Sequence, residues 1–135
     1  MPLLAHNETT LYQLESFTNR GKNCCIVNPC GSGKTSVISA YLHKHPEKTA
    51  ILFTKQKNAK QYYCEKDPIF ENITIVTYSM MYKDYQIGNI NKYNADLYIL
   101  DEAHYIGAYN WNKAFEALVD KYQPIIVGIT ATPQR

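Results

Sequence analysis

The chain has 135 residues, and its 14 Lys and Arg against 12 Asp and Glu give a formal net charge of +2 at pH 7. This length suits one domain with a buried core and is short for a multidomain enzyme, and the near balance of charge neither requires nor excludes nucleic acid as a partner. The four cysteines form no paired C-x-x-C zinc pattern, so we expect reduced thiols. No apolar stretch approaches the roughly 20 residues that span a bilayer, so we expect a soluble intracellular protein, cytoplasmic or nuclear, without a membrane partner.

Strand-like and helical segments alternate along the chain. A first helix is predicted from a cap at Thr9 or Thr10 to about residue 19, because Leu11 and Leu14 have helical spacing and Gly21 is a good stop. Further helices are expected at about 34–43, 55–66 and 112–122, and strands at 24–27, 49–54, 73–77, 97–100 and 125–129. Residues 80–94 have a poor apolar period and indicate no clear element. The alternation predicts an α/β sandwich with a largely parallel sheet, in which the C-terminal ends of the strands share one edge.

One glycine-rich loop carries the strongest chemical signal. Residues 28–35 read Asn-Pro-Cys-Gly-Ser-Gly-Lys-Thr and lie between a predicted strand and a predicted helix, which is the context that a P-loop requires. The glycines let successive backbone N–H groups point at phosphate oxygens, and the start of the following helix adds its positive end. Lys34 can reach the β- and γ-phosphates, and Thr35 can coordinate Mg²⁺. The predicted phosphate site consists of Pro29, Cys30, Gly31, Ser32, Gly33, Lys34 and Thr35.

An acidic pair follows the fourth predicted strand. Asp101 is placed to hold the Mg²⁺ shell, and Glu102 is placed to orient the attacking water as a base. By itself, an acidic pair after a strand is typical of a helix cap or a solvated turn. The upstream Gly-Ser-Gly-Lys-Thr and the following Ala103 and His104 favour the catalytic interpretation.

Three motifs, taken in order, resemble one family. The P-loop, the sequence D-E-A-H at 101–104 and the sequence T-A-T-P at 130–133 resemble the N-terminal RecA-like domain of superfamily 2 helicases and translocases of the DEAD/DEAH kind. Weaker matches surround them: residues 11–13 resemble the Y-Q element before the P-loop, residues 54–55 motif Ia, and residues 77–79 the T-Y-S form of motif Ib. The resemblance covers about residues 11–135 and implies a RecA-like P-loop NTPase, a three-layer sandwich with a mostly parallel sheet, that uses ATP and Mg²⁺.

The resemblance also implies roles for individual residues. Gln13 would contact the adenine edge, where a side-chain amide can donate and accept at once. Lys34 and Thr35 would bind phosphates and Mg²⁺, Asp101 would coordinate Mg²⁺ through water, and Glu102 would polarise the hydrolytic water. The residues that would couple the nucleotide state to the grip on nucleic acid are His104, Thr130 and Thr132.

Nucleic acid is the partner that the resemblance implies. The combination of D-E-A-H with G-I-T-A-T-P resembles the restriction-enzyme-like and repair-type branch, which favours DNA over RNA. Contacts are expected from Lys55, Thr77 and Tyr78. The lysine-rich residues 55–66 leave two interpretations open: phosphate contacts beside a stacking tyrosine ring, or a solvated basic helix whose tyrosines pack in the core.

Two departures from the family pattern affect the expected site. Cys30 stands where Thr is usual, either as a small buried loop residue or as an oxidation-sensitive thiol. In the family, a second RecA-like domain completes the ATP site and supplies an arginine finger, whereas residues 1–135 form a single domain of the first kind. We therefore expect that second domain to act in cis or in trans, and we expect the chain alone to bind ATP weakly and hydrolyse it slowly.

The sequence thus predicts the ATP-binding half of a nucleic-acid-dependent helicase or translocase. The alternative is a truncated or split module that binds nucleotide or a partner without efficient hydrolysis. A small P-loop kinase would need lid arginines, and Arg occurs only at positions 20 and 135, which counts against that class.

Overall fold

The computed structural model describes residues 5–28, 34–102 and 111–131. Its helices are α1 (Ala5–Asn19), α2 (Lys34–Lys44), α3 (Ala59–Lys66), α4 (Tyr78–Ile87) and α5 (Trp111–Tyr122), with two 3₁₀ turns, η1 (Pro68–Asn72) and η2 (Asn91–Tyr93). The strands are β1 (Cys24–Asn28), β2 (Ala50–Thr54), β3 (Thr74–Thr77), β4 (Leu97–Asp101) and β5 (Ile125–Ala131). They form one five-stranded sheet in the order β1-β5-β4-β2-β3, and each of these strand pairings is parallel.

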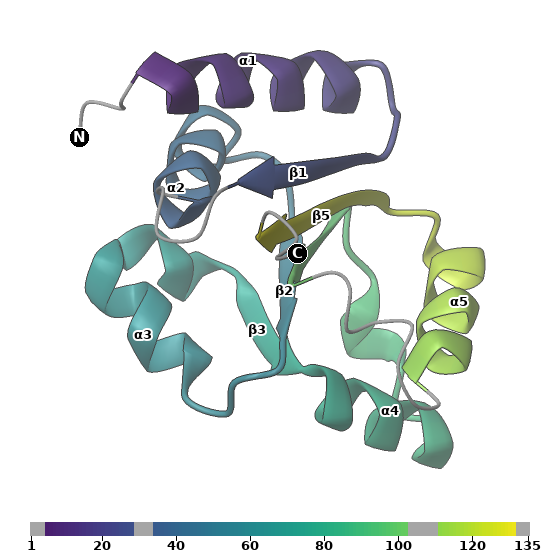
Figure 1. Ribbon diagram of the computed structural model, residues 1–135. Helices are drawn as coiled ribbons and strands as arrows, with labels where there is room; N and C mark the ends of the chain where they lie inside the picture. Colours follow the sequence, from purple (N-terminus) through teal and green to yellow (C-terminus); the bar gives the residue numbers. More distant parts are fainter. Residues whose placement is uncertain (1–4, 29–33, 103–110, 132–135) are drawn as a thin grey trace.

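Helices cover both faces of the sheet, which makes three layers (Figure 1). Successive strand residues point to opposite faces, so a strand that is buried on both faces reads as a continuous apolar run. In β2, Ala50 and Leu52 join the core under α1, α2 and α3, whereas Ile51 and Phe53 join the core under α4 and α5. The predicted α/β sandwich with a parallel sheet is confirmed.

The helix after the P-loop has the predicted inward face. The side chains of Val37, Ile38, Tyr41 and Leu42 are all buried in the core between α2 and the sheet. Their spacing places them on one side of the helix, as the sequence indicates. This burial holds the N-terminal end of α2, where Lys34 and Thr35 lie, at a fixed place beside the sheet.

Two helix starts differ from the prediction. Helix α1 begins at Ala5, so Thr9 and Thr10 lie inside the helix and the predicted cap is wrong. The end is as expected, because Gly21 adopts a left-handed φ of 69° and its N–H donates to the Thr18 carbonyl at 3.0 Å. Helix α3 begins at Ala59, four residues after the predicted start at position 55, and its lysine-rich approach lies outside the helix.

Helix α4 occupies most of the stretch for which the sequence indicated no clear element. Its N-cap is Thr77, whose side chain accepts a hydrogen bond from the Met80 N–H at 3.0 Å. Its C-terminal end is Gly88, with a φ of 78° and N–H bonds back to the helix carbonyls. These two end signals were present in the sequence, but the short and irregular apolar pattern between them hid the helix.

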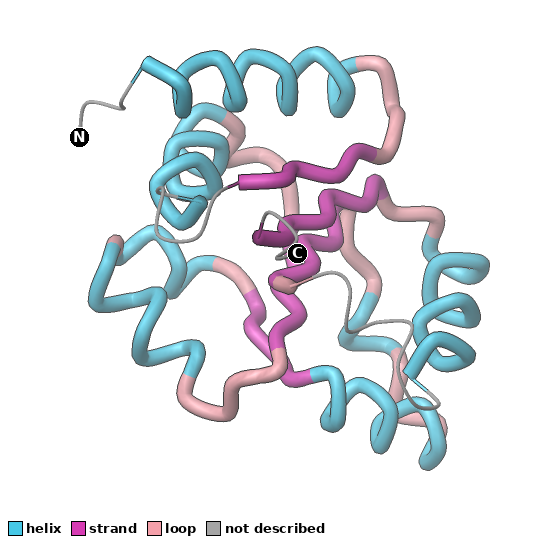
Figure 2. The backbone as a smooth tube through the Cα atoms, viewed as in Figure 1, coloured by secondary structure: helices cyan, strands magenta, loops and turns pink. Residues whose placement is uncertain are grey.

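Because each strand pairing is parallel, the five strands, drawn in magenta in Figure 2, end at the same edge of the sheet. The last residues of the strands are Asn28, Thr54, Thr77, Asp101 and Ala131. Parallel α/β sheets bind ligands outside this edge, so it is where a site is expected. Among the described helices, none has the length and apolar character needed to cross a membrane.

Candidate nucleotide-binding site

The P-loop motif has the strand-to-helix setting that it needs. Strand β1 ends at Asn28 and helix α2 begins at Lys34, so residues 29–33 connect the sheet edge to the helix start. Thr35 lies in the first turn of α2 and is half-buried. Lys34 is placed by its backbone alone, and Pro29, Cys30, Gly31, Ser32 and Gly33 lie outside the described residues. Their roles at the phosphates therefore stay predictions.

Strand β5 lies between the strand before the P-loop and the strand that carries the acidic pair. Its residue Thr130 pairs with Val27 of β1, and its residue Ile129 pairs with Asp101 of β4. The predicted coupling residue Thr130 is thus one register position from the strand contact of Asp101. The other two coupling residues, His104 and Thr132, lie outside the described residues.

The carboxylate of Asp101 is buried, with 6% of the residue exposed, at the end of the central strand β4. Its Oδ2 atom accepts a hydrogen bond from the Tyr63 hydroxyl at 2.8 Å and another from Thr54 Oγ1 at 3.3 Å. Burial, followed by the charge of Asp101, raises the pKa of Tyr63 well above its ordinary value of 10.0, so the phenol keeps its proton at neutral pH. The Tyr63 hydroxyl is therefore a permanent donor to this carboxylate.

A second tyrosine holds the backbone at the same place. The Tyr78 hydroxyl donates to the carbonyl oxygen of Asp101 at 2.7 Å, and the Tyr78 ring stacks on Trp111 with 5.3 Å between centroids. Tyr78 has no exposed surface. The expectation that Tyr78 contacts nucleic acid is therefore wrong, because its ring packs between α4 and α5 and its hydroxyl is used inside the protein.

Glu102 has an uncommon backbone conformation. Its φ is 53°, in the left-handed region that non-glycine residues seldom adopt. Such a residue costs about 1–3 kcal/mol and persists where the surrounding structure imposes it, often at a functional site. The strain sits on the residue that was predicted to act as the base, one position after the buried Asp101.

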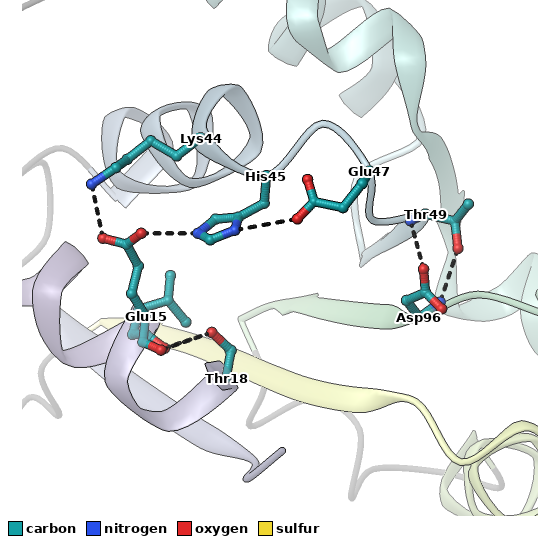
Figure 3. A network of polar contacts seen from close by, with 8 residues as sticks. Glu15, Thr18, Lys44, His45, Glu47, Thr49 and Asp96 are labelled. Carbon is teal, nitrogen blue, oxygen red and sulfur yellow. Dashed lines mark hydrogen bonds and ion pairs between the residues drawn. The ribbon is translucent and has the colours of Figure 1, made fainter. Parts of the chain in front are cut away.

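The adenine-contact candidate Gln13 lies on the exposed side of α1, and a polar network attaches this helix to the end of α2 (Figure 3). Glu15 accepts contacts from Lys44 Nζ at 3.1 Å and from His45 Nε2 at 2.9 Å. Burial opposes the ionisation of Glu15, but its contacts with His45 and Lys44 outweigh it and lower the Glu15 pKa. His45 is largely enclosed, with 15% of its side chain exposed.

The structure agrees in part with each of the two interpretations of the lysine-rich residues 55–66. Lys55, Lys57 and Lys60 are exposed, as either interpretation requires. Of the nearby tyrosines, Tyr63 is buried in the core, whereas Tyr62 is 46% exposed. Thr77, the remaining predicted nucleic-acid contact, is half-buried and caps α4. The contacts of Lys55 and Thr77 with nucleic acid stay predictions.

The three described thiols, Cys24, Cys25 and Cys64, are free. Burial, followed by the neighbouring Cys25, raises the pKa of Cys24 to about 11. A thiol with such a pKa is protonated at neutral pH and is a poor nucleophile or metal ligand. Cys24 therefore acts as a small packing residue beneath α1 and α2.

The donors at the strand edge have the chemistry that Mg²⁺ prefers. Mg²⁺ takes hard oxygen ligands and is usually bound by one or two protein groups together with substrate phosphates and water. Thr35 supplies a hydroxyl at the start of α2, and Asp101 supplies a carboxylate at the end of β4. Within the described ranges, this edge included, no group of three or more His, Cys, Asp or Glu side chains could hold a metal ion.

Residues 40–135 match the family described as type III restriction enzyme, res subunit. The chain belongs to this family. The match includes the acidic pair and the strand that leads to T-A-T-P, and it begins five residues after the end of the P-loop motif. A comparison of this chain with curated proteins found no match.

Two solved structures are similar to this res-subunit family chain in fold. One is the SWI2/SNF2 ATPase core of Sulfolobus solfataricus in complex with dsDNA, with a TM-score of 0.74, 15% identity, and 98% of this chain and 32% of that chain covered. The other is the Hef helicase domain of Pyrococcus furiosus, with a TM-score of 0.69, 20% identity, and 99% of this chain and 33% of that chain covered. The chain thus spans about a third of the length of each. Family and fold together identify a RecA-like domain of the superfamily 2 helicase type.

Proposed function

We propose that this chain binds ATP with Mg²⁺ and hydrolyses it as the first RecA-like domain of a nucleic-acid-dependent helicase or translocase. The observation that carries the proposal is the register at the strand ends. Strand β5 connects the two halves of the site, because Thr130 pairs with the P-loop strand and Ile129 pairs with Asp101. A buried carboxylate at the end of β4, at the sheet edge that β1 also reaches before the P-loop helix begins, supports a role in phosphoryl transfer.

Each residue has a defined part in the proposed reaction. Lys34 and the backbone N–H groups of residues 29–33 would bind the phosphates, and Gln13 would contact the adenine. Thr35 and Asp101 would hold the Mg²⁺, which neutralises charge that develops on the phosphates. Glu102 would accept a proton from the attacking water and orient it. His104, Thr130 and Thr132 would pass the nucleotide state to the nucleic-acid side of the domain.

The partners follow from the same reasoning. We propose that a second RecA-like domain, in cis or in trans, completes the ATP site with an arginine finger, because such fingers contribute about 10³–10⁵ in rate. DNA is favoured over RNA, since the family is that of a restriction enzyme subunit and one solved structure of similar fold was determined with dsDNA. We propose that Lys55, which is exposed, and Thr77, which is half-buried, contact the nucleic acid.

The test is an ATPase measurement on the chain with a second RecA-like domain added in trans, with and without single-stranded DNA, double-stranded DNA or RNA. We expect nucleic acid to stimulate turnover, and we expect Lys34→Ala and Glu102→Gln each to remove the stimulated rate. The matched controls are Lys113→Ala and Glu116→Gln, which change the same residue types on the exposed side of α5 and should leave the rate unchanged.

The outcomes separate the two functional hypotheses. Rapid turnover by the chain alone that nucleic acid does not change would contradict the proposal. ATP binding that needs Lys34, without stimulated turnover under any condition, would support the alternative of a nucleotide-binding module without efficient hydrolysis.

A further inference from the structure

One buried contact at the site belongs to no motif of the family pattern. Tyr63 extends from α3 to the end of β4, where its hydroxyl donates to Asp101 Oδ2 at 2.8 Å. The two residues are 38 positions apart in the sequence. Thr54, at the end of β2, donates to the same oxygen at 3.3 Å. The carboxylate that would face the metal is therefore held from two other elements.

The Tyr63 side chain is itself held in place. The residue is 2% exposed, and its ring packs against Phe70 of η1 with 5.0 Å between centroids and edge-on against Tyr62 at 5.3 Å. A phenol fixed by packing at its ring presents its hydroxyl at one point. The contact therefore links α3 to the carboxylate at a fixed position, because the buried Tyr63 side chain moves less than an exposed one would.

A carboxylate needs such support to bind a metal in one orientation. The terminal torsion of Asp is broad, so an unsupported carboxylate rotates over a wide range. Two donors on a single oxygen select one rotation and fix which way the other oxygen points. Partners of this kind are known to affect metal sites strongly, and their loss typically costs about 10–100-fold in metal affinity or activity.

We propose that Tyr63 is a positioning residue for the Mg²⁺ site, which acts by holding the carboxylate of Asp101 in the orientation that receives the metal of bound Mg–ATP. The inference rests on the proposed function. It also makes α3 part of the metal site, because a displacement of this helix would move the Tyr63 hydroxyl. The Tyr63 ring is buried and its hydroxyl donates to Asp101, so Tyr63 would act through that carboxylate and its effect should appear only when Mg²⁺ is present.

The experiment measures binding of a fluorescent ATP analogue to the full chain, first in excess EDTA and then during a Mg²⁺ titration. For Tyr63→Phe we expect the Mg²⁺ concentration at half-saturation to rise about tenfold or more, while the affinity in EDTA stays within about twofold of the wild type. Tyr98→Phe is the matched control. It removes one hydroxyl from another buried tyrosine, whose bond goes to the Tyr93 carbonyl at 2.6 Å, and it should match the wild type in both conditions.

A second variant keeps the test decisive if Tyr63→Phe folds poorly. Thr54→Val removes the other donor to Oδ2 with little change of volume, and it should raise the half-saturating Mg²⁺ concentration in the same direction by a smaller factor, because its bond is longer. Equal losses of affinity with and without Mg²⁺ would show a general distortion and overturn the positioning role. So would a Tyr63→Phe titration that matches that of Tyr98→Phe.

Failure of the proposed function gives a different result. If the wild type shows no nucleotide binding that Lys34→Ala removes, the proposed function falls and the role of Tyr63 falls with it. If the wild type binds Mg–nucleotide through Lys34 and the Tyr63→Phe titration is unchanged, only the role of Tyr63 is overturned.

Discussion

The left-handed backbone at Glu102 allows stability and catalysis to be separated at one residue. Its φ of 53° costs a residue with a side chain about 1–2 kcal/mol, and glycine does not have this cost. Glycine, however, is more flexible in the unfolded chain, and this lowers the free energy of unfolding by about 0.5–1 kcal/mol relative to other residues. The balance predicts that Glu102→Gly stabilises the fold by about 0.5–1 kcal/mol, or about 2–4 °C in Tm for a domain of this size.

The assay is urea denaturation, with thermal unfolding as a second measure. Glu102→Gln keeps the strained backbone, so its free energy of unfolding should equal that of the wild type, although both substitutions should remove hydrolysis under the proposed function. Glu116→Gly serves as the control, because glycine on the exposed side of α5 should destabilise by about 1 kcal/mol. The reasoning is refuted if Glu102→Gly unfolds at a lower urea concentration than Glu102→Gln with the same dependence on denaturant.

Two further predictions concern the packing of the core and the dependence of stability on pH below about 4. Phe53 has no exposed surface, and its ring centroid lies 5.0 Å from that of Tyr98 and 6.0 Å from that of Phe115. Phe53→Ala should therefore lower the free energy of unfolding, measured by urea denaturation, by about 3–5 kcal/mol. As a control, Phe17→Ala should lower it far less, because Phe17 is 40% exposed. Hydrogen bonds from the Ile69 N–H and the Ser39 hydroxyl lower the pKa of Asp67 from 3.8 to about 2. Because a carboxylate with a lowered pKa stabilises the fold above its unfolded pKa, this contribution should be lost as the pH falls from about 4 to 2. The stability advantage of the wild type over Asp67→Asn should therefore shrink across that range, and a constant difference would contradict the assignment.

The chain's secondary structure could be predicted where a local pattern carries it. The apolar runs at 50–54 and 97–100 are buried on both faces, which is why they read as continuous and why their strand character was clear. Helix α4 was missed because its inward residues Tyr78, Met81 and Asp84 include a charged side chain. That carboxylate is buried only because Lys92 and the Tyr93 hydroxyl, at 2.7 Å and 2.6 Å, satisfy it from the next turn.

The sequence by itself determined which candidate residues lie in contiguous motifs. The candidates Lys34, Thr35, Asp101 and Glu102 could be proposed because a P-loop and an acidic pair need few residues at fixed spacing, and because the end of a parallel strand is where such groups gather. Only the tertiary structure decided what surrounds them. The bond from Tyr63 to Asp101 spans 38 positions and that from His45 to Glu15 spans 30, and the sheet order that brings β5 between β1 and β4 is equally non-local. No local pattern encodes such contacts, because they depend on how helices pack across a sheet, and for that reason a tyrosine that could have stacked on a base became the support of a carboxylate.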